Sequence, residues 1–149
     1  MKEALKPAES KCTAEQAIQW AKKLQDGLNE PVDPVILTAV AGLHMQGIET
    51  RQSCQGHLDW GEPFPWIDIL PSSREAFLEL LEVVPLPGFA LSKNRLIPLK
   101  AAPFNPFSPF TVEAIPLHNN PLTRPYLLKS LPAHQAQISA WGEQLLSNP

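Results

Sequence analysis

Cysteine and positive charge are both scarce in this chain. Only two cysteines, Cys12 and Cys54, occur among 149 residues. Two cysteines are too few for a disulfide framework and are more typical of free thiols in a reducing compartment. Lysine and arginine together number 12 against 15 acidic residues, which gives a net charge of −3. This balance argues against a dedicated duplex nucleic-acid binder, which needs a dense basic face.

Long apolar runs are also missing. No stretch of the sequence is long and apolar enough to span a bilayer, and residues 1–10 lack the hydrophobic segment of a signal peptide. We therefore expect a cytoplasmic protein with no membrane partner. The sequence also contains no dinucleotide fingerprint, phosphate-binding P-loop, nucleophile elbow or zinc-ribbon spacing. None of these well-marked classes is therefore indicated.

The composition is that of a chain that folds. Hydrophobic residues make up 44% and charged residues 18%, so residues 1–149 are expected to form a single domain with one core. Residues 1–12 are polar and are predicted to be flexible. Proline is abundant, with 17 residues, and segment 101–109 is predicted to be a Pro/Phe-rich extended connection.

Helix signals mark the first part of the chain. Thr13 and Gln16 form a capping box, which predicts a helix from residue 14. Asp33 as N-cap with Pro34 in the first turn predicts a second helix. Gly47 suits the left-handed residue that ends that helix.

Later signals complete the predicted fold. Ser72 with Glu75 predicts a helix to about residue 84, and a closing helix is predicted from Pro132 to residue 146. Pro98 is expected to place its strand at a sheet edge. Alternating apolar residues predict strands at 48–54, 66–70, 89–92, 95–99 and 110–115. Short links between strands favour an α+β domain: a mainly antiparallel sheet of about four to five strands, with helices packed on one face.

Residues 53–66 hold most of the chemistry of the chain. A thiol, an imidazole, two carboxylates and two indoles lie together in a loop that glycine and proline keep from being helical. Cys54 and His57 are three residues apart, so a turn can bring them together as a tentative catalytic pair. The alternative is structural: Cys54 is then a small buried hydrophobe and His57 a loop cap.

The same loop predicts a small-ligand site. Flat indole surfaces beside a few polar groups are typical of such sites, and an arginine nearby can contact an anion. The leading hypothesis is binding of a small polar or anionic ligand, with thiol chemistry as its reactive step. Asp59, Glu62 or Asp68 could orient His57. The expected ligand contacts are Arg51, Ser53, Gln55, Gly56, Asp59, Trp60 and Trp66.

No cofactor is predicted, and zinc is the alternative. Thiolate and imidazole are zinc ligands, so Cys54 and His57 could bind it, with His44 as a third ligand. A single Cys-x-x-His pair supports this weakly, because structural zinc sites normally show two ligand pairs.

A repeat outside the loop suggests a different class of function. Residues 103–110 read Pro-Phe-Asn-Pro-Phe-Ser-Pro-Phe, a three-residue period that matches polyproline II. The phenylalanines could fill the core, or they could dock a protein partner. A non-enzymatic interaction module, or a homo-oligomer, is therefore the second hypothesis.

The motif resembles two families. Residues 47–57 read Gly-Ile-Glu-Thr-Arg-Gln-Ser-Cys-Gln-Gly-His, and residues 63–66 read Pro-Phe-Pro-Trp. The pattern resembles a Gly-Ile-x-Thr-x-x-Ser-Cys-x-Gly-His…Pro-x-Pro-Trp signature of small uncharacterised bacterial proteins, which carries no established activity. Residues 50–56 are also similar to the Ser-Ser-Cys-Ser-Gly-Arg segment of wybutosine-synthesis methyltransferase-like proteins, where arginine stands at the position of His57. This second resemblance implies an RNA-modification accessory protein.

Overall fold

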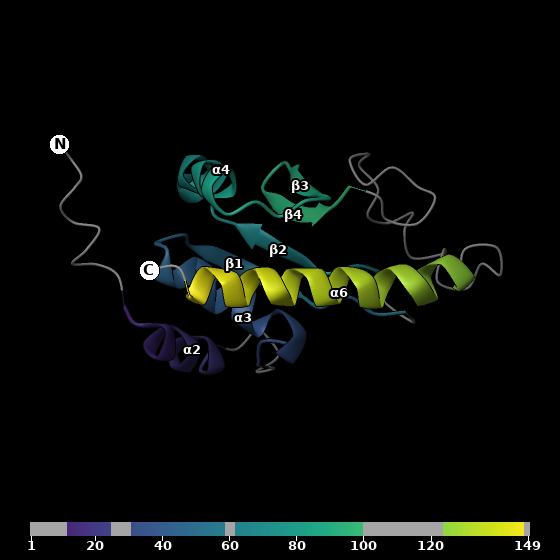
Figure 1. Cartoon of the computed structure of the whole chain (residues 1–149), viewed down its shortest axis with the longest axis horizontal. Helices are drawn as coiled ribbons and strands as arrows, with labels where there is room; N and C mark the ends of the chain where they lie inside the picture. The colour runs from purple at the N-terminus through teal and green to yellow at the C-terminus, as the bar shows by residue number, and fades with distance from the viewer. Residues whose placement is uncertain (1–11, 25–30, 59–61, 100–123, 148–149) are drawn as a thin grey trace.

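The computed structural model describes residues 12–24, 31–58, 62–99 and 124–147. In these ranges pairs of neighbouring strands are separated by helices, which is the pattern of an α+β domain (Figure 1). The elements are α2 (Ala14–Lys22), α3 (Pro34–Met45), β1 (Thr50–Cys54), β2 (Trp66–Ile69), the short 3-10 helix η1 (Pro71–Ser73), α4 (Arg74–Val83), β3 (Phe89–Ser92), β4 (Arg95–Pro98) and α6 (Arg124–Leu146).

The described strands form one antiparallel sheet in the order β1-β2-β4-β3. On β1, Cys54 is opposite Trp66 of β2, so the two side chains point to the same face of the sheet. On the next pair, Asp68 of β2 is opposite Arg95 of β4. The predicted fold class, an antiparallel sheet with helices, is confirmed.

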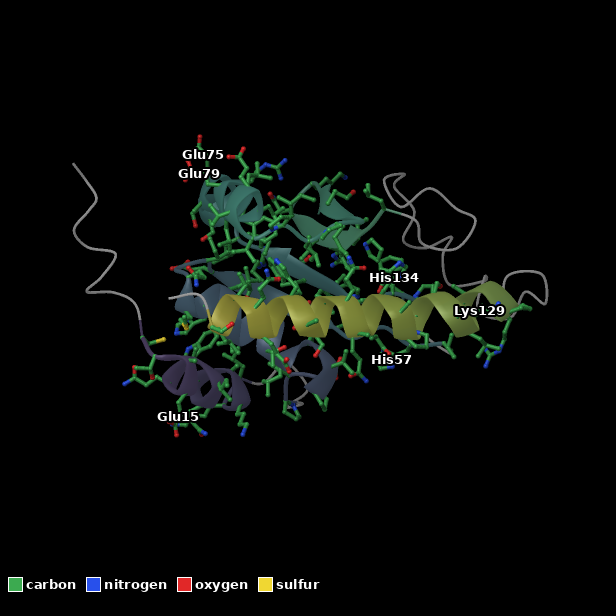
Figure 2. All side chains as sticks on the ribbon, viewed as in Figure 1. Glu15, His57, Glu75, Glu79, Lys129 and His134 are labelled. Atoms are coloured by element: carbon green, nitrogen blue, oxygen red, sulfur yellow. The ribbon has the colours of Figure 1, made fainter. Side chains whose placement is uncertain are left out.

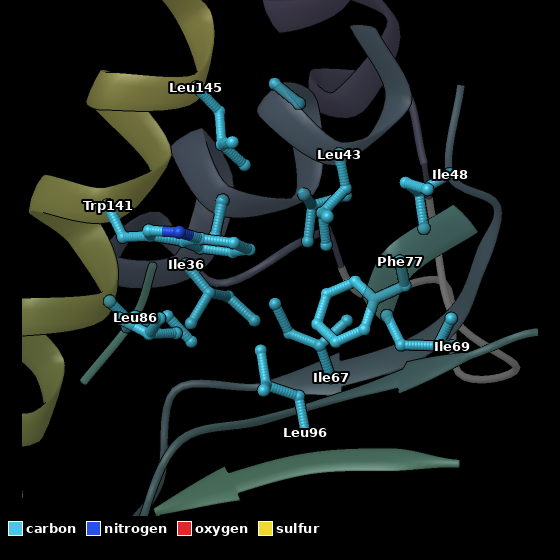
Figure 3. Packing of buried hydrophobic residues seen from close by; sticks show 14 of the residues in the cluster. Ile36, Leu43, Ile48, Ile67, Ile69, Phe77, Leu86, Leu96, Trp141 and Leu145 are labelled. Atoms are coloured by element: carbon cyan, nitrogen blue, oxygen red, sulfur yellow. The ribbon is translucent and has the colours of Figure 1, made fainter. Parts of the chain in front are cut away.

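The opposite face of the sheet is the apolar one. Ile67 and Ile69 of β2 and Leu96 of β4 are each at most 1% exposed, as the two-residue period of a strand requires. The helices bring their own apolar side chains to this face (Figure 3). These include Ile36, Leu43, Phe77, Trp141 and Leu145.

Helices α3 and α6 pack against each other unusually closely. Thr38 Oγ1 donates to the Ser139 carbonyl at 3.0 Å, and Gln46 Nε2 donates to the Leu145 carbonyl at 3.2 Å. Because the later residue of α3 contacts the later residue of α6, the two helices run in the same direction. Gly142 makes the closeness possible, because a Cβ there would stand 2.2 Å from the backbone nitrogen of Ala39.

Two predicted helix ends are confirmed. Thr13 Oγ1 accepts the Gln16 N–H, and Gln16 Oε1 accepts the Thr13 N–H, which completes the capping box. At the end of α3, Gly47 has φ +84° and Ile48 N–H donates to the Leu43 carbonyl at 2.9 Å. This is the Schellman pattern, and it turns the chain from α3 toward β1.

The prediction that Pro98 places its strand at the edge is wrong. β4 lies between β2 and β3, and β3 is the outer strand. β2 pairs with β4 only at Leu96 and Arg95, whereas Pro98 lies opposite Phe89 of β3. Pro98 therefore stands past the end of the β2 ladder, where its missing N–H interrupts no hydrogen bond to β2.

Two predicted helix starts are also wrong. α6 begins at Arg124, and Pro132 lies inside it. Pro132 has no N–H to donate to the carbonyl of Leu128, four residues earlier, and Leu128 is an exposed residue of the helix. α4 begins at Arg74, so Ser73 and not the predicted Ser72 is its N-cap residue. The Ser73 hydroxyl does not cap the helix, because it accepts the Glu49 N–H at 2.9 Å.

Three further expectations lie outside the described residues. They are the flexible residues 1–12 (apart from Cys12), the Pro/Phe segment 101–109 with its repeat at 103–110, and the strand at 110–115. Within the described ranges, no helix combines the length and the apolar character that crossing a membrane requires, α6 included.

Candidate functional site

Three donor side chains from two separate segments converge at the start of α3. Asp33 directly precedes α3, Cys54 ends β1, and His57 follows in the loop. One ligand atom from each lies within 4.8 Å of the others. Figure 2 shows His57 on one side of α6 and His134 on the other, so His134 is not part of this group.

Asp33 occupies the N-cap position of α3 but does not cap the helix. Its side chain makes no hydrogen bond to the first turn. Instead, Asp33 Oδ2 accepts the backbone N–H of Gln55 at 2.9 Å, and Gln55 Oε1 accepts the backbone N–H of Val35 at 3.4 Å. Gln55 from the loop thus caps the first turn of α3 in place of Asp33. The Asp33 carboxylate lies near Cys54 and His57 instead.

Helix α6 fixes the loop from the other side. Gln135 Nε2 donates to the Gln55 carbonyl at 2.9 Å. Gly56 has φ +91°, and a Cβ there would stand 2.7 Å from both Leu131 Cδ1 and the Phe64 carbonyl carbon. Glycine is therefore required at this position for its backbone angle and for its small size. These contacts hold the loop against α3 and α6 at once.

The loop closes on itself at its far side. The backbone N–H of His57 donates to the Glu62 carbonyl at 3.1 Å. Glu62 also places its carboxylate 3.9 Å from an Arg95 nitrogen. Residue 62 therefore holds the His57 backbone and contributes a carboxylate to the surroundings of the site.

The environment of the Cys54 thiol is apolar and negatively charged. Burial raises the pKa of Cys54 to about 11, and the Asp33 and Glu62 carboxylates act in the same direction. The Gly56 N–H, which donates to Sγ at 3.4 Å, and the Arg95 charge lower the pKa in part. The thiol is thus protonated at neutral pH. A permanently activated thiolate would need a lowered pKa, and the pKa of Cys54 is raised instead.

Arg95 is held on the sheet face that also carries Cys54. Its Nε donates to Asp68 Oδ1 at 2.7 Å, and its guanidinium lies 3.8 Å from the centre of a Trp66 ring. Asp68 therefore orients an arginine across the β2–β4 pair. The Trp66 indole N–H is buried and has no hydrogen-bond partner among the described residues. Such a group is rare enough to need an explanation.

The remaining residues that the sequence predicted as ligand or metal contacts do not gather at this site. Arg51 is exposed on β1, and Ser53, next to Cys54, is partly buried. His44 stacks on Trp20 with ring centroids 3.6 Å apart, so it serves the α2–α3 contact. Asp59 and Trp60 lie outside the described residues. Of the predicted residues, the described site therefore contains Cys54, Gln55, Gly56 and His57, with Trp66 beside them on the same face of the sheet.

Sequence reasoning missed two members of this arrangement. Asp33 was interpreted only as a helix cap, and Gln135 had no role. No local signal separates Asp33 from an ordinary helix cap, because aspartate followed by proline at the first helical position is itself a common helix start. No local pattern marks Gln135, because its partner Gln55 is 80 residues away.

Comparison of the chain with protein-family models, with curated proteins and with solved structures finds no match.

Proposed function

We propose that this protein binds a small polar ligand at the loop of residues 53–66, with the Cys54 thiol as the group that contacts it and the site of any chemistry. The observation that carries the proposal is the convergence of Asp33, Cys54 and His57 within 4.8 Å. Three side chains with different chemistry, brought together from two segments, are typical of a binding centre rather than of a structural contact.

The charges near Cys54 favour a particular kind of ligand. The sequence suggested a polar or anionic ligand. Two carboxylates, Asp33 and Glu62, act on Cys54, whereas the Arg95 guanidinium is already bound by Asp68. An anion would meet net repulsion at the thiol, so a neutral or cationic ligand is favoured.

Thiol chemistry at this site requires removal of a proton. Because the pKa of Cys54 is raised to about 11, the thiol attacks only when a base takes its proton as the ligand arrives. His57 offers an imidazole nitrogen within 4.8 Å of the sulfur, so it is the base that the geometry provides.

Selective labelling of Cys54 tests the proposal. In a Cys12→Ser protein, three small chloroacetamides of matched size, one neutral, one cationic and one anionic, react with the single remaining thiol. Their rates, followed by intact mass, are divided by their rates with glutathione. We expect the cationic and neutral probes to exceed the anionic one, and Asp33→Asn to reduce the difference. Equal corrected rates for all three probes, unchanged by Asp33→Asn, would contradict the proposal.

The RNA and protein-partner hypotheses receive no comparable support. Arg74 donates to the Lys93 carbonyl and to Asn94, and Arg95 is paired with Asp68, so these two arginines do not supply a free basic strip. The Pro-Phe repeat lies outside the described residues.

A further inference from the structure

We propose that Asp33, Cys54 and His57 form a binding site for a divalent transition-metal ion, with Zn²⁺ as the first candidate. This inference rests on the ligand-binding role of the same loop and identifies the ligand as a metal cation. It replaces the ligand set that the sequence suggested, because Asp33 takes the place of His44.

The donor atoms select the class of metal. The set contains one sulfur, one imidazole nitrogen and one carboxylate oxygen. Calcium and magnesium prefer oxygen donors alone, whereas zinc accepts all three kinds. A thiolate and a carboxylate also balance the two positive charges of the ion. The donor chemistry therefore favours zinc over the alkaline-earth ions.

The spacing of the donors is close to that of a formed site. Zinc lies about 2.3 Å from sulfur and about 2.0–2.2 Å from nitrogen and oxygen, so tetrahedral donors are about 3.3–3.7 Å apart. Here the donors lie within 4.8 Å of one another without an ion. Closing the largest of these separations requires each donor to move by about 1 Å or less.

The surroundings hold the donors in the way that metal sites require. A backbone N–H from Gln55 binds the Asp33 carboxylate at 2.9 Å, and the Gly56 N–H donates to the Cys54 sulfur at 3.4 Å. Hydrogen bonds of this kind orient ligands and stabilise a thiolate once the ion has displaced its proton. The His57 backbone is fixed by its bond to the Glu62 carbonyl. The Asp33 carboxylate, the Cys54 sulfur and the His57 backbone are therefore held before any ion arrives.

Three protein donors also indicate what the ion would do. Catalytic zinc sites have three protein ligands and keep a fourth position for water or substrate, whereas structural sites use four. Among the described residues, the group has three donors. A neutral polar molecule could then bind the ion directly, in agreement with the neutral or cationic preference of the site.

Zinc binding to tag-free protein tests the inference. A Cys12→Ser protein is titrated with zinc in competition with a chromophoric chelator. We expect one zinc per chain, and a loss of affinity of more than about 100-fold in Asp33→Asn, Cys54→Ser and His57→Gln, since outer partners alone cost about 10–100-fold. His44→Gln is the matched control and should bind zinc normally. Circular dichroism checks that each variant is folded.

A second measurement keeps Asp33, Cys54 and His57 unchanged, so its result does not depend on whether the substituted variants fold. In the Cys12→Ser protein, zinc should protect Cys54 from iodoacetamide, and magnesium should not. Binding that is absent, or that survives Cys54→Ser and Asp33→Asn unchanged, would overturn the metal site. If zinc fails to bind while the chloroacetamide preference persists, the ligand site stands and only the metal assignment falls. If both effects are absent, both proposals fall.

Discussion

Helices α3 and α6 meet in two regions that use opposite chemistry. Toward the end of α3, Gly142 and Leu145 of α6 lie against Ala39 and Gly42, and the contact is apolar and tight. At the start of α3, the same two helices enclose the polar loop through Gln135 and Asp33. We call the first region the glycine contact (Ala39, Gly42, Gly142, Leu145) and the second the loop contact (Asp33, Gln55, Gly56, Gln135).

The difference shows how a small domain can hold a polar centre in place. The glycine contact fixes the position of one helix relative to the other through backbone packing that cannot adjust. The loop contact then needs only a few hydrogen bonds to place its donors, because the helices are already positioned. Substitutions at the glycine contact should therefore affect stability most, and substitutions at the loop contact should affect binding most.

Gly142→Ala should have the largest effect on stability. The new Cβ would lie 2.2 Å from Ala39 N and 2.4 Å from the Thr38 carbonyl carbon, so the helices must separate. We expect a loss of about 3 kcal/mol, the upper end for overpacking a core. Denaturant unfolding measures it. Gly47→Ala is the control: that residue has φ +84° but open space around it, so about 1 kcal/mol of backbone strain is expected. Equal losses for the two variants would contradict the packing argument.

Gly56→Ala should affect binding more than Gly142→Ala does. Its Cβ would meet the Phe64 backbone at 2.7 Å, and φ +91° is strained for alanine. The loop must shift, which moves Cys54 away from Asp33. At a temperature where both variants are folded, we expect Gly56→Ala to abolish the charge preference in Cys54 labelling and Gly142→Ala to retain it. A retained preference in Gly56→Ala would show that the loop tolerates the shift.

High pH should weaken the fold through the Cys54 thiol, which lies next to the loop contact. Burial raises the pKa of Cys54 from an ordinary 9.0 to about 11. Between these values the unfolded chain has lost the thiol proton and the folded chain retains it, so stability falls as pH rises through this window. Thermal unfolding of Cys12→Ser should show a falling midpoint from pH 9 to 11. Cys12→Ser/Cys54→Ala should show a smaller fall; identical slopes would exclude a contribution from Cys54.

Gln135→Ala should have the smallest effect. It removes one hydrogen bond to the Gln55 carbonyl, worth about 1 kcal/mol. Gln144→Ala is the control, since Gln144 is an exposed side chain on the same helix and should cost less than about 0.5 kcal/mol. Denaturant unfolding compares them. A cost for Gln135→Ala no larger than that of the control would mean that α6 does not hold the loop.

Local signals predicted much of this fold. The capping box at Thr13, the glycine end of α3 at Gly47 and the alternation in β2 each depend on residues that are close in sequence. The wrong predictions depended on distant partners. α4 begins one residue after Ser73 and not after the predicted cap Ser72, and the Ser73 hydroxyl accepts the Glu49 N–H across 24 residues. The position of Pro98 in the sheet follows from where β2 ends.

The residues of the candidate site also fall into those that local sequence patterns reveal and those that only distant contacts reveal. The loop itself was visible because Cys54, Gly56 and His57 lie within four residues. Asp33 was not visible as a donor, because its role follows from a hydrogen bond to Gln55 across 22 residues. The role of His44 followed from its stacking on Trp20, which helical spacing alone does not reveal. Sequence therefore located the site, and tertiary contacts selected its members.

Cobalt substitution tests the central claim most directly, because the absorption of bound Co²⁺ reports on its ligands. Added to metal-free Cys12→Ser protein, cobalt should give one bound ion per chain, with an intense visible spectrum of tetrahedral geometry and a sulfur-to-cobalt charge-transfer band. The band should vanish in Cys12→Ser/Cys54→Ser and persist in Cys12→Ser/His44→Gln. A weak octahedral spectrum without the charge-transfer band would show that Asp33, Cys54 and His57 do not form a metal centre.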